Sequence, residues 1–449
     1  MKEVLTVAKK SVCLLILLVC LGYVGIAAVY TLPEKTIVFN ASASTDFMVS
    51  EYVSKEMEWM NWPDFYTDMV MLNIASYSDG SKGALYRAAV NEKIGHTAED
   101  SYPFEIVRWL SERTPIEKVY YTFEEASASA EAVSYGKYWN GYLIFLRPLL
   151  LYFNMRQIYT GFRILLAFCF AITVFILFVK DKRFMMPFTV AFFTLRPFAK
   201  FCLSYAVIEI LLCVFLCVSV LDRKAMGDPI SRDILYFGMG AVVAFFTLMS
   251  FSFIIPVFCA VYLVCGEKTE KRFNKELVKT LIRLVFWYTA GFVAMWASKW
   301  IILAVADNNL LSKVIYSVQQ RLSHEDYGEK VSLREALLWN ACGFFYQNKA
   351  LICAFVLFAV LTVISLFLWL HLEKREEPHG RVWFSRGAII IATTVFAIVA
   401  RYAIVLNHSR VHFFFMNRLF AGPVFAILSV CLMNVCHLFG LMRKRQVIS

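Results

Sequence analysis

The run SVCLLILLVCLGYVGIAAVYT (residues 11–31) decides the fold. It contains no charged side chain, and it is long enough to cross the roughly 30 Å of hydrocarbon in a bilayer as a single helix. Lys9 and Lys10 precede it, as in a signal peptide, but the apolar run exceeds the roughly 7–15 residues of such a signal. We therefore predict a retained membrane helix, with residues 1–31 forming a cytoplasmic N-terminus and the first span.

The rest of the chain repeats this apolar character. Of its 449 residues, 59% are hydrophobic, and the mean hydropathy of +0.60 is that of an integral membrane protein. Further runs of spanning length lie at about 157–179, 199–221, 281–305, 350–371, 386–406 and 416–440, and shorter or broken ones at 184–197, 234–250 and 252–266. The sequence predicts an all-α polytopic membrane protein with about ten transmembrane helices and no internal repeat.

The basic residues set the orientation. Lys and Arg gather in short loops at alternate ends of the predicted spans, namely at 9–10, 180–183, 222–224, 268–279, 374–381 and 443–445. Because cytoplasmic loops carry this excess, both termini are expected in the cytoplasm of a bacterial cytoplasmic membrane. The same bias accounts for the net charge of +11, so nucleic-acid binding is not expected.

One long polar stretch, residues 32–140, follows the first span. It is followed by GYLIFLRPLLLYF (141–153), which is too short to span and predicts a helix in the membrane interface. Within the stretch, residues 66–77 predict a helix with one apolar side. We therefore expect a mainly helical extracytoplasmic domain at 32–156 and a transmembrane bundle of about nine helices at 157–449.

Two carboxylates in this domain are candidates for chemistry. Asp64 and Asp68 are four residues apart, so on a helix they share one face. Such a pair could act as a general base or bind a divalent metal. The alternative is a solvated helix start, since Asp64 follows Pro63 and acidic residues favour a helix N-terminus. Asp46 is a further candidate.

Several cations lie where the orientation rule does not place them. Arg147, Arg196, Lys200, Arg410 and Arg418 fall at outer ends of predicted spans, and Lys299 and Arg401 lie deeper. Charges inside a bilayer are costly, and Arg matches phosphate geometry with paired hydrogen bonds. For Lys299 and Arg401 the pattern favours a phosphate-bearing substrate, whereas Arg147 and Arg410, taken singly, are expected to snorkel to ordinary headgroups. Glu209 is expected to pair with Lys299 or Arg401 as a structural contact.

The segment 407–412 adds two histidines to these cations. His408 and His412 are four residues apart and could bind a metal, although hydrogen bonding to a polar substrate is the favoured interpretation. The sequence has no Walker loop, no GxGxxG after a strand and no GxSxG. An activated substrate is therefore expected to come from the membrane and not from a soluble nucleotide.

Four runs resemble segments of the GT-C superfamily of polytopic glycosyltransferases: PDFYTDMVMLNIAS (63–76), YWNGYLIFLRPLLLYFN (138–154), WASKW (296–300) and NHSRVHFFFMNRL (407–419). The overall plan, a first extracytoplasmic loop above a bundle, is similar as well. The resemblance implies that Asp64 or Asp68 is the acid of the first loop. It also implies phosphate contacts from Lys299, Arg401 and Arg418. Apart from the resemblance, we expect His408, His412 and Arg196 to contact the substrate. Asp64 lies further from the first span than in many members, which keeps Asp46 open.

The resemblance implies transfer of a hexose or pentose from a polyprenyl-phosphate donor to a glycan or lipid acceptor on the outer face of the membrane. The acid of the extracytoplasmic domain would deprotonate the acceptor hydroxyl, and the cations at the outer ends of the spans would stabilise the departing lipid phosphate. The sequence establishes no cofactor, and a divalent metal stays among the alternatives. The alternatives are a polymerase or ligase of lipid-linked polysaccharide, a flippase, a non-catalytic member, and a receptor.

Overall fold

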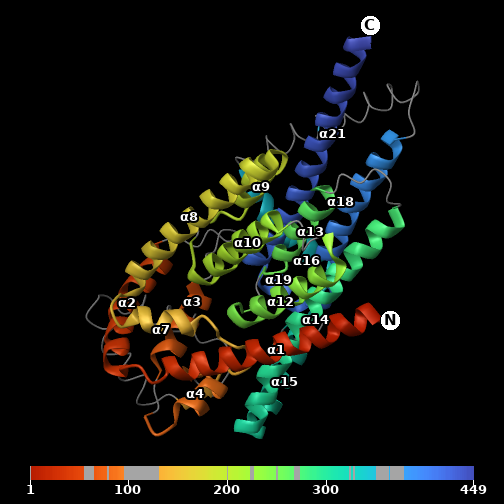
Figure 1. Cartoon of the computed structure of the whole chain (residues 1–449). Coiled ribbons are helices and arrows are strands. Elements are labelled where there is room, and N and C mark those ends of the chain that lie inside the picture. Colours follow the sequence, from red (N-terminus) through yellow and green to blue (C-terminus); the bar gives the residue numbers. More distant parts are fainter. Residues whose placement is uncertain are drawn as a thin grey trace.

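The computed structural model shows a predominantly helical, multi-pass membrane protein (Figure 1). It describes residues 2–54, 65–77, 80–95, 131–199, 201–222, 227–248, 251–266, 274–322, 325–326, 329–349, 360, 364 and 379–448. Seven helices or helix pairs in these ranges are long and apolar enough to span a membrane. They are Lys2–Val29, Met155–Thr194, Leu203–Leu221, Pro229–Phe246, Leu277–Ala306, Gly387–Ile404 and Phe413–Met433.

The spans correspond to α1 (Lys2–Val29), α8 (Met155–Asp181) with α9 (Met185–Thr194), α10 (Leu203–Leu221), α12 (Pro229–Phe246), α14 (Asn274–Ala306), α18 (His379–Ile404) and α21 (Ala421–Ile448). The predicted piece at 184–197 is α9, which follows α8 after the turn η1 (Lys182–Phe184). The piece at 252–266 is the shorter apolar helix α13 (Ile254–Gly266). Most of the predicted span 350–371 lies outside the described residues, so the number ten stays a prediction.

A pair of glycines sets a close crossing between α12 and α14. Gly240 of α12 lies against the backbone of Tyr288, and Gly291 of α14 lies against that of Phe237. A Cβ atom at either glycine would fall 2.0 Å from the facing carbonyl oxygen. Small residues allow membrane helices to approach this closely. The crossing fixes α14, which forms one wall of the site described below.

The polar stretch after α1 folds into a lobe at one end of the bundle (Figure 1). Its described elements are α2 (Glu34–Ser54), α3 (Phe65–Ser76), α4 (Ala84–Val90), β1 (Glu92–Gly95), β2 (Glu131–Ser134) and α7 (Leu143–Leu150). The helix expected at 66–77 is confirmed as α3, and α7 occupies the expected 141–153 segment. The antiparallel pair β1–β2 was not predicted, because its four-residue strands lack an alternating pattern.

Arg147 of α7 ties the lobe to the first span. Its Nε donates to the carbonyl of Val29 at 2.9 Å and its Nη1 donates to the carbonyl of Ala75, while its guanidinium lies 4.7 Å from the Tyr30 ring centre. Burial lowers the pKa of Arg147 to about 10. The two carbonyls lie at the C-terminal ends of α1 and α3. Arg147 therefore holds two helix ends together, a structural role that the sequence did not predict.

The remaining described elements lie between α14 and α21. α15 (Asn308–Leu322) follows α14, and the short strands β3 (Glu325–Asp326) and β4 (Glu329–Lys330) lead to α16 (Leu333–Gln347). After α18 the chain is broken into α19 (Leu406–Val411), α20 (Phe413–Met416) and η2 (Asn417–Phe420) before α21. Broken helices at membrane depth occur where they are buried in protein or line a cavity. Here the side-chain amide of Asn340 on α16 donates to the Ser409 carbonyl at 2.8 Å and so gives one backbone carbonyl of the broken segment a hydrogen-bond donor.

Candidate functional site

A cavity of about 560 Å³ lies between α14 and α18. Most of the side chains around it are apolar. Polar and charged groups come from Arg401 of α18 and His408 of α19, from Lys137 and Tyr138 in the segment before α7, and from Ser252, Thr289 and Thr393 along the walls. We call this cavity the groove. An apolar cavity with few convergent polar groups is the usual form of a small-molecule site.

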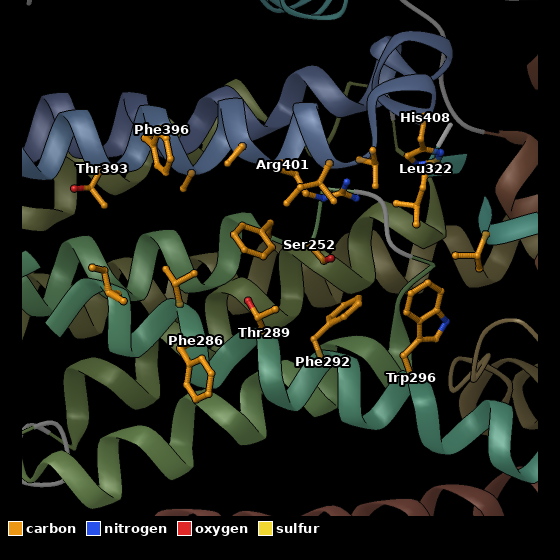
Figure 2. Close-up of a pocket in the computed structure, with 18 of the residues that line it drawn as sticks. Ser252, Phe286, Thr289, Phe292, Trp296, Leu322, Thr393, Phe396, Arg401 and His408 are labelled. Atoms are coloured by element: carbon orange, nitrogen blue, oxygen red, sulfur yellow. The ribbon is translucent and has the colours of Figure 1, made fainter. Parts of the chain in front are cut away.

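Figure 2 shows the order of these groups along the groove. Phe286 and Phe396 lie in its apolar half, Arg401 lies near Ser252 and Phe292, and Trp296 and His408 lie at the far end. Phe286 and Trp296 are ten residues apart on α14, which corresponds to roughly 15 Å along a helix axis. The groove therefore runs from an apolar stem to a cationic, aromatic mouth.

The apolar half of the groove is open to the side. Ile282 and Phe286 of α14 are 63% and 59% exposed, and Phe396 of α18 is 70% exposed. In a membrane-spanning helix such exposed apolar side chains face lipid chains. Exposed apolar side chains of both α14 and α18 therefore border this half of the groove.

The mouth is held in place by two indoles of α14. Trp296 Nε1 donates to the Lys137 carbonyl at 2.6 Å, and Trp300 Nε1 donates to the same oxygen at 3.2 Å. In return, Trp139 donates to the Met295 carbonyl at 2.6 Å. Asn140 adopts a left-handed φ of 57°, which turns the chain after this contact. The segment WASKW is therefore the docking surface on which the lobe rests.

Lys299 takes part in the same docking. Its Nζ donates to the carbonyl of Ala88 at 2.7 Å and lies 5.6 Å from the Trp139 ring centre, and the side chain is fully buried. It is absent from the groove lining. The geometry gives Lys299 a role in fixing α4 of the lobe to α14. The predicted contact with substrate phosphate has no support from this position.

Arg418 is also buried away from the groove. It forms an ion pair with Glu209 of α10 at 3.2 Å, and its guanidinium lies 3.9 Å from the Tyr205 ring centre. The expectation that Glu209 pairs with Lys299 or Arg401 was wrong as to the partner. The break between α18 and α21 turns Arg418 of η2 toward α10, and this turn could not be read from helical spacing.

Asp68 of α3 accepts three hydrogen bonds. The Tyr159 hydroxyl donates to Oδ2, as does the Leu203 amide, and the Ser204 amide donates to Oδ1 at 2.9 Å. Burial raises the pKa of Asp68, and these bonds oppose that shift. The two amides belong to the first turn of α10, so Asp68 caps that helix from the lobe. Its carboxylate is buried and is not part of the groove lining.

The other lobe carboxylates can be placed only in part. Asp64 lies outside the described residues, and Asp46 lies on α2. Arg196, which follows α9, adopts a left-handed φ of 56° immediately before Pro197. It is absent from the groove lining, so the structure does not bring Arg196 together with Arg401.

The two histidines lie together as the spacing suggested. The ring centres of His408 and His412 are 4.4 Å apart, and His412 stacks on Phe415 at 5.1 Å. His408 lines the groove and His412 does not. Among the described residues no group of three or more His, Cys, Asp or Glu side chains could hold a metal ion. His408 is therefore the member of the pair that is placed to hydrogen-bond a ligand at the mouth.

Sequence reasoning identified Arg401 and His408, which the fold brings together in the groove, but it missed Lys137, Tyr138 and Trp296. Tyr138 and Trp296 begin two of the runs quoted for the family resemblance, and Lys137 immediately precedes one of them, but nothing in those runs indicated that these side chains line a cavity. Comparison of the chain with family models, curated proteins and solved structures finds no match.

Proposed function

We propose that the chain is a membrane glycosyltransferase that uses a polyprenyl-phosphate sugar as donor. In this proposal the chain has ten spans in a bacterial cytoplasmic membrane, both termini are cytoplasmic, and the lobe faces outward. The observation that carries the proposal is the groove: a laterally open apolar stem that ends at Arg401, His408 and Lys137. A prenyl chain matches the stem, and a phosphate matches cations at its end.

Such a donor would lie lengthwise in the groove, with each of its parts beside a different set of side chains. The lipid chain lies beside Phe286 and Phe396, and the phosphate lies at Arg401. On transfer the acceptor oxygen attacks the anomeric carbon, the bond from that carbon to the phosphate oxygen breaks, and the lipid phosphate leaves with the electron pair. Arg401 and Lys137 stabilise the charge that develops on this phosphate.

A base must take the proton of the acceptor hydroxyl. Because Asp68 already accepts three hydrogen bonds, the role falls first to Asp64 or Asp46 of the lobe. The acceptor approaches from the lobe side, where the mouth of the groove is bounded by Lys137 and Tyr138. No cofactor enters this scheme.

The test is transfer of radiolabelled sugar from a panel of polyprenyl-phosphate sugars to membrane acceptors in proteoliposomes. Arg401→Gln should lower the rate at limiting donor by about 10–100-fold, since hydrogen bonds to charged groups contribute roughly 1.5–3 kcal/mol. The matched control is Arg156→Gln, an exposed cation at the start of α8 that does not line the groove. Equal rates in both variants would contradict the proposal.

One observation favours a second candidate, a polymerase or ligase of lipid-linked polysaccharide. The described lining of the groove contains cations and a histidine but no carboxylate. A ligase that relies on Arg for two lipid-linked partners would need no lobe acid. Full activity of the combined Asp46→Asn, Asp64→Asn and Asp68→Asn variant, with loss in Arg401→Gln, would favour this candidate.

A further inference from the structure

The mouth of the groove presents a rigid aromatic surface immediately beyond the cations. Trp296 and Tyr138 both line the groove, their ring centres are 6.4 Å apart, and their planes differ by 10°. Figure 2 shows the Trp296 ring directed from α14 toward Leu322 and His408, at the end of the groove farthest from Phe286. Its ring is therefore directed into the cavity and not toward lipid.

The orientation of this indole is fixed before any ligand arrives. Its N–H is already committed to the Lys137 carbonyl at 2.6 Å, and its ring packs at 4.7 Å against Trp300. The ammonium of Lys137 lies 4.8 Å from the Tyr135 ring centre and 5.8 Å from that of Tyr138. A preorganised surface loses little entropy on binding.

We infer that Trp296 and Tyr138 form a sugar-binding platform that stacks against the ring of a lipid-linked hexose whose phosphate lies at Arg401. Along the groove the order is apolar stem, Arg401, then Trp296, which is the order of chain, phosphate and sugar in such a lipid. The C–H face of a sugar ring carries slight positive charge, and an aromatic face carries negative charge. His408 and Lys137 supply hydrogen-bonding groups at the rim.

The inference rests on the proposed binding of a lipid phosphate and adds a separate site for the sugar. It is tested by measuring dissociation constants in nanodiscs for geranylgeranyl phosphate and for the same lipid phosphate carrying one glucose or one mannose. The wild-type protein should bind at least one of the glycosylated lipids roughly three- to tenfold more tightly than the bare phosphate, the size expected of one aromatic contact.

Trp296→Leu should abolish this gain and leave the affinity for bare geranylgeranyl phosphate within twofold. The matched control is Trp339→Leu, because Trp339 of α16 packs on Phe413, does not contact Trp296 through the lobe carbonyl and does not line the groove. It should keep the full gain. Thermal unfolding of both variants separates loss of the platform from loss of the lobe contact.

Two results would overturn the platform. One is equal affinity of the wild-type protein for all three lipids, which would leave the lipid-phosphate site of the proposed function intact. The other is an undiminished gain in Trp296→Leu. Failure of every lipid to bind the wild-type protein would reject the proposed function together with the platform.

Discussion

Glu209 and Arg418 form an ion pair of 3.2 Å inside the bundle, with 1% and 4% of their side chains exposed. The pair joins α10 to the broken segment before α21. Breaking a buried pair by removing one partner leaves an uncompensated charge, and this costs about 3–5 kcal/mol. Glu209→Leu should therefore lower the thermal unfolding temperature strongly in detergent.

The double variant Glu209→Leu with Arg418→Met should recover most of this loss, since apolar replacements of both partners are often neutral. Comparison of the two single variants and the double variant gives the coupling energy. If the double variant is as unstable as the sum of the singles, the pair does not stabilise the fold in the way its geometry indicates.

Asp68 provides a direct contrast between a structural and a catalytic carboxylate. Asp68→Asn would place an amide group against N–H donors of the first turn of α10. We expect a loss of about 2–3 kcal/mol in unfolding free energy, because hydrogen bonds to a charged group are involved. Tyr159→Phe should lose about 1–2 kcal/mol through the same network. Thermal unfolding measures both.

The prediction for Asp68 is contradicted by an Asp68→Asn variant that unfolds at the wild-type temperature and has lost sugar transfer. That result would return Asp68 to the catalytic role implied by the family resemblance. A stable, active variant would remove it from both roles.

Lys299 should behave as part of the lobe contact and not as part of the groove. In Lys299→Met the Ala88 carbonyl loses its donor, so we expect a loss of about 1–3 kcal/mol in stability. The affinity for geranylgeranyl phosphate should stay within twofold of wild type, since Lys299 does not line the groove. A large loss of affinity at unchanged stability would show that Lys299 contacts the ligand.

The glycine crossing of α12 and α14 should tolerate no added methyl group. Gly240→Ala would place its Cβ 2.0 Å from the Tyr288 carbonyl oxygen, so the helices must separate. Overpacking costs about 1–3 kcal/mol, and here it also displaces the groove wall. Gly161→Ala on α8 is the control, since nothing lies within 4 Å of the added carbon. Equal unfolding temperatures in the two variants would show that the crossing is looser than the backbone contact indicates.

The sequence was sufficient for the membrane character and for most of the helices, because apolar length alone predicts a span. It was also sufficient to find Arg401 and His408, because charged and titratable side chains stand out in apolar runs. The sequence did not reveal which other side chains line the groove with Arg401 and His408. Lys299 and Trp296 share the segment WASKW, yet one is buried under the lobe and the other lines the groove. That difference depends on helix rotation and on the docking of Lys137, both of which are tertiary properties.

In the proposed function, lipid phosphate occupies the groove between α14 and α18. The most direct test is photolabelling in nanodiscs with a prenyl phosphate that carries a diazirine on its chain, followed by mass spectrometry of the labelled peptides. We expect saturable labelling around Phe286, Phe396 and Ile404, which the unlabelled lipid phosphate displaces. Labelling that is as strong on the exposed face of α8, around Phe168 and Phe175, and that competitor does not displace, would contradict it.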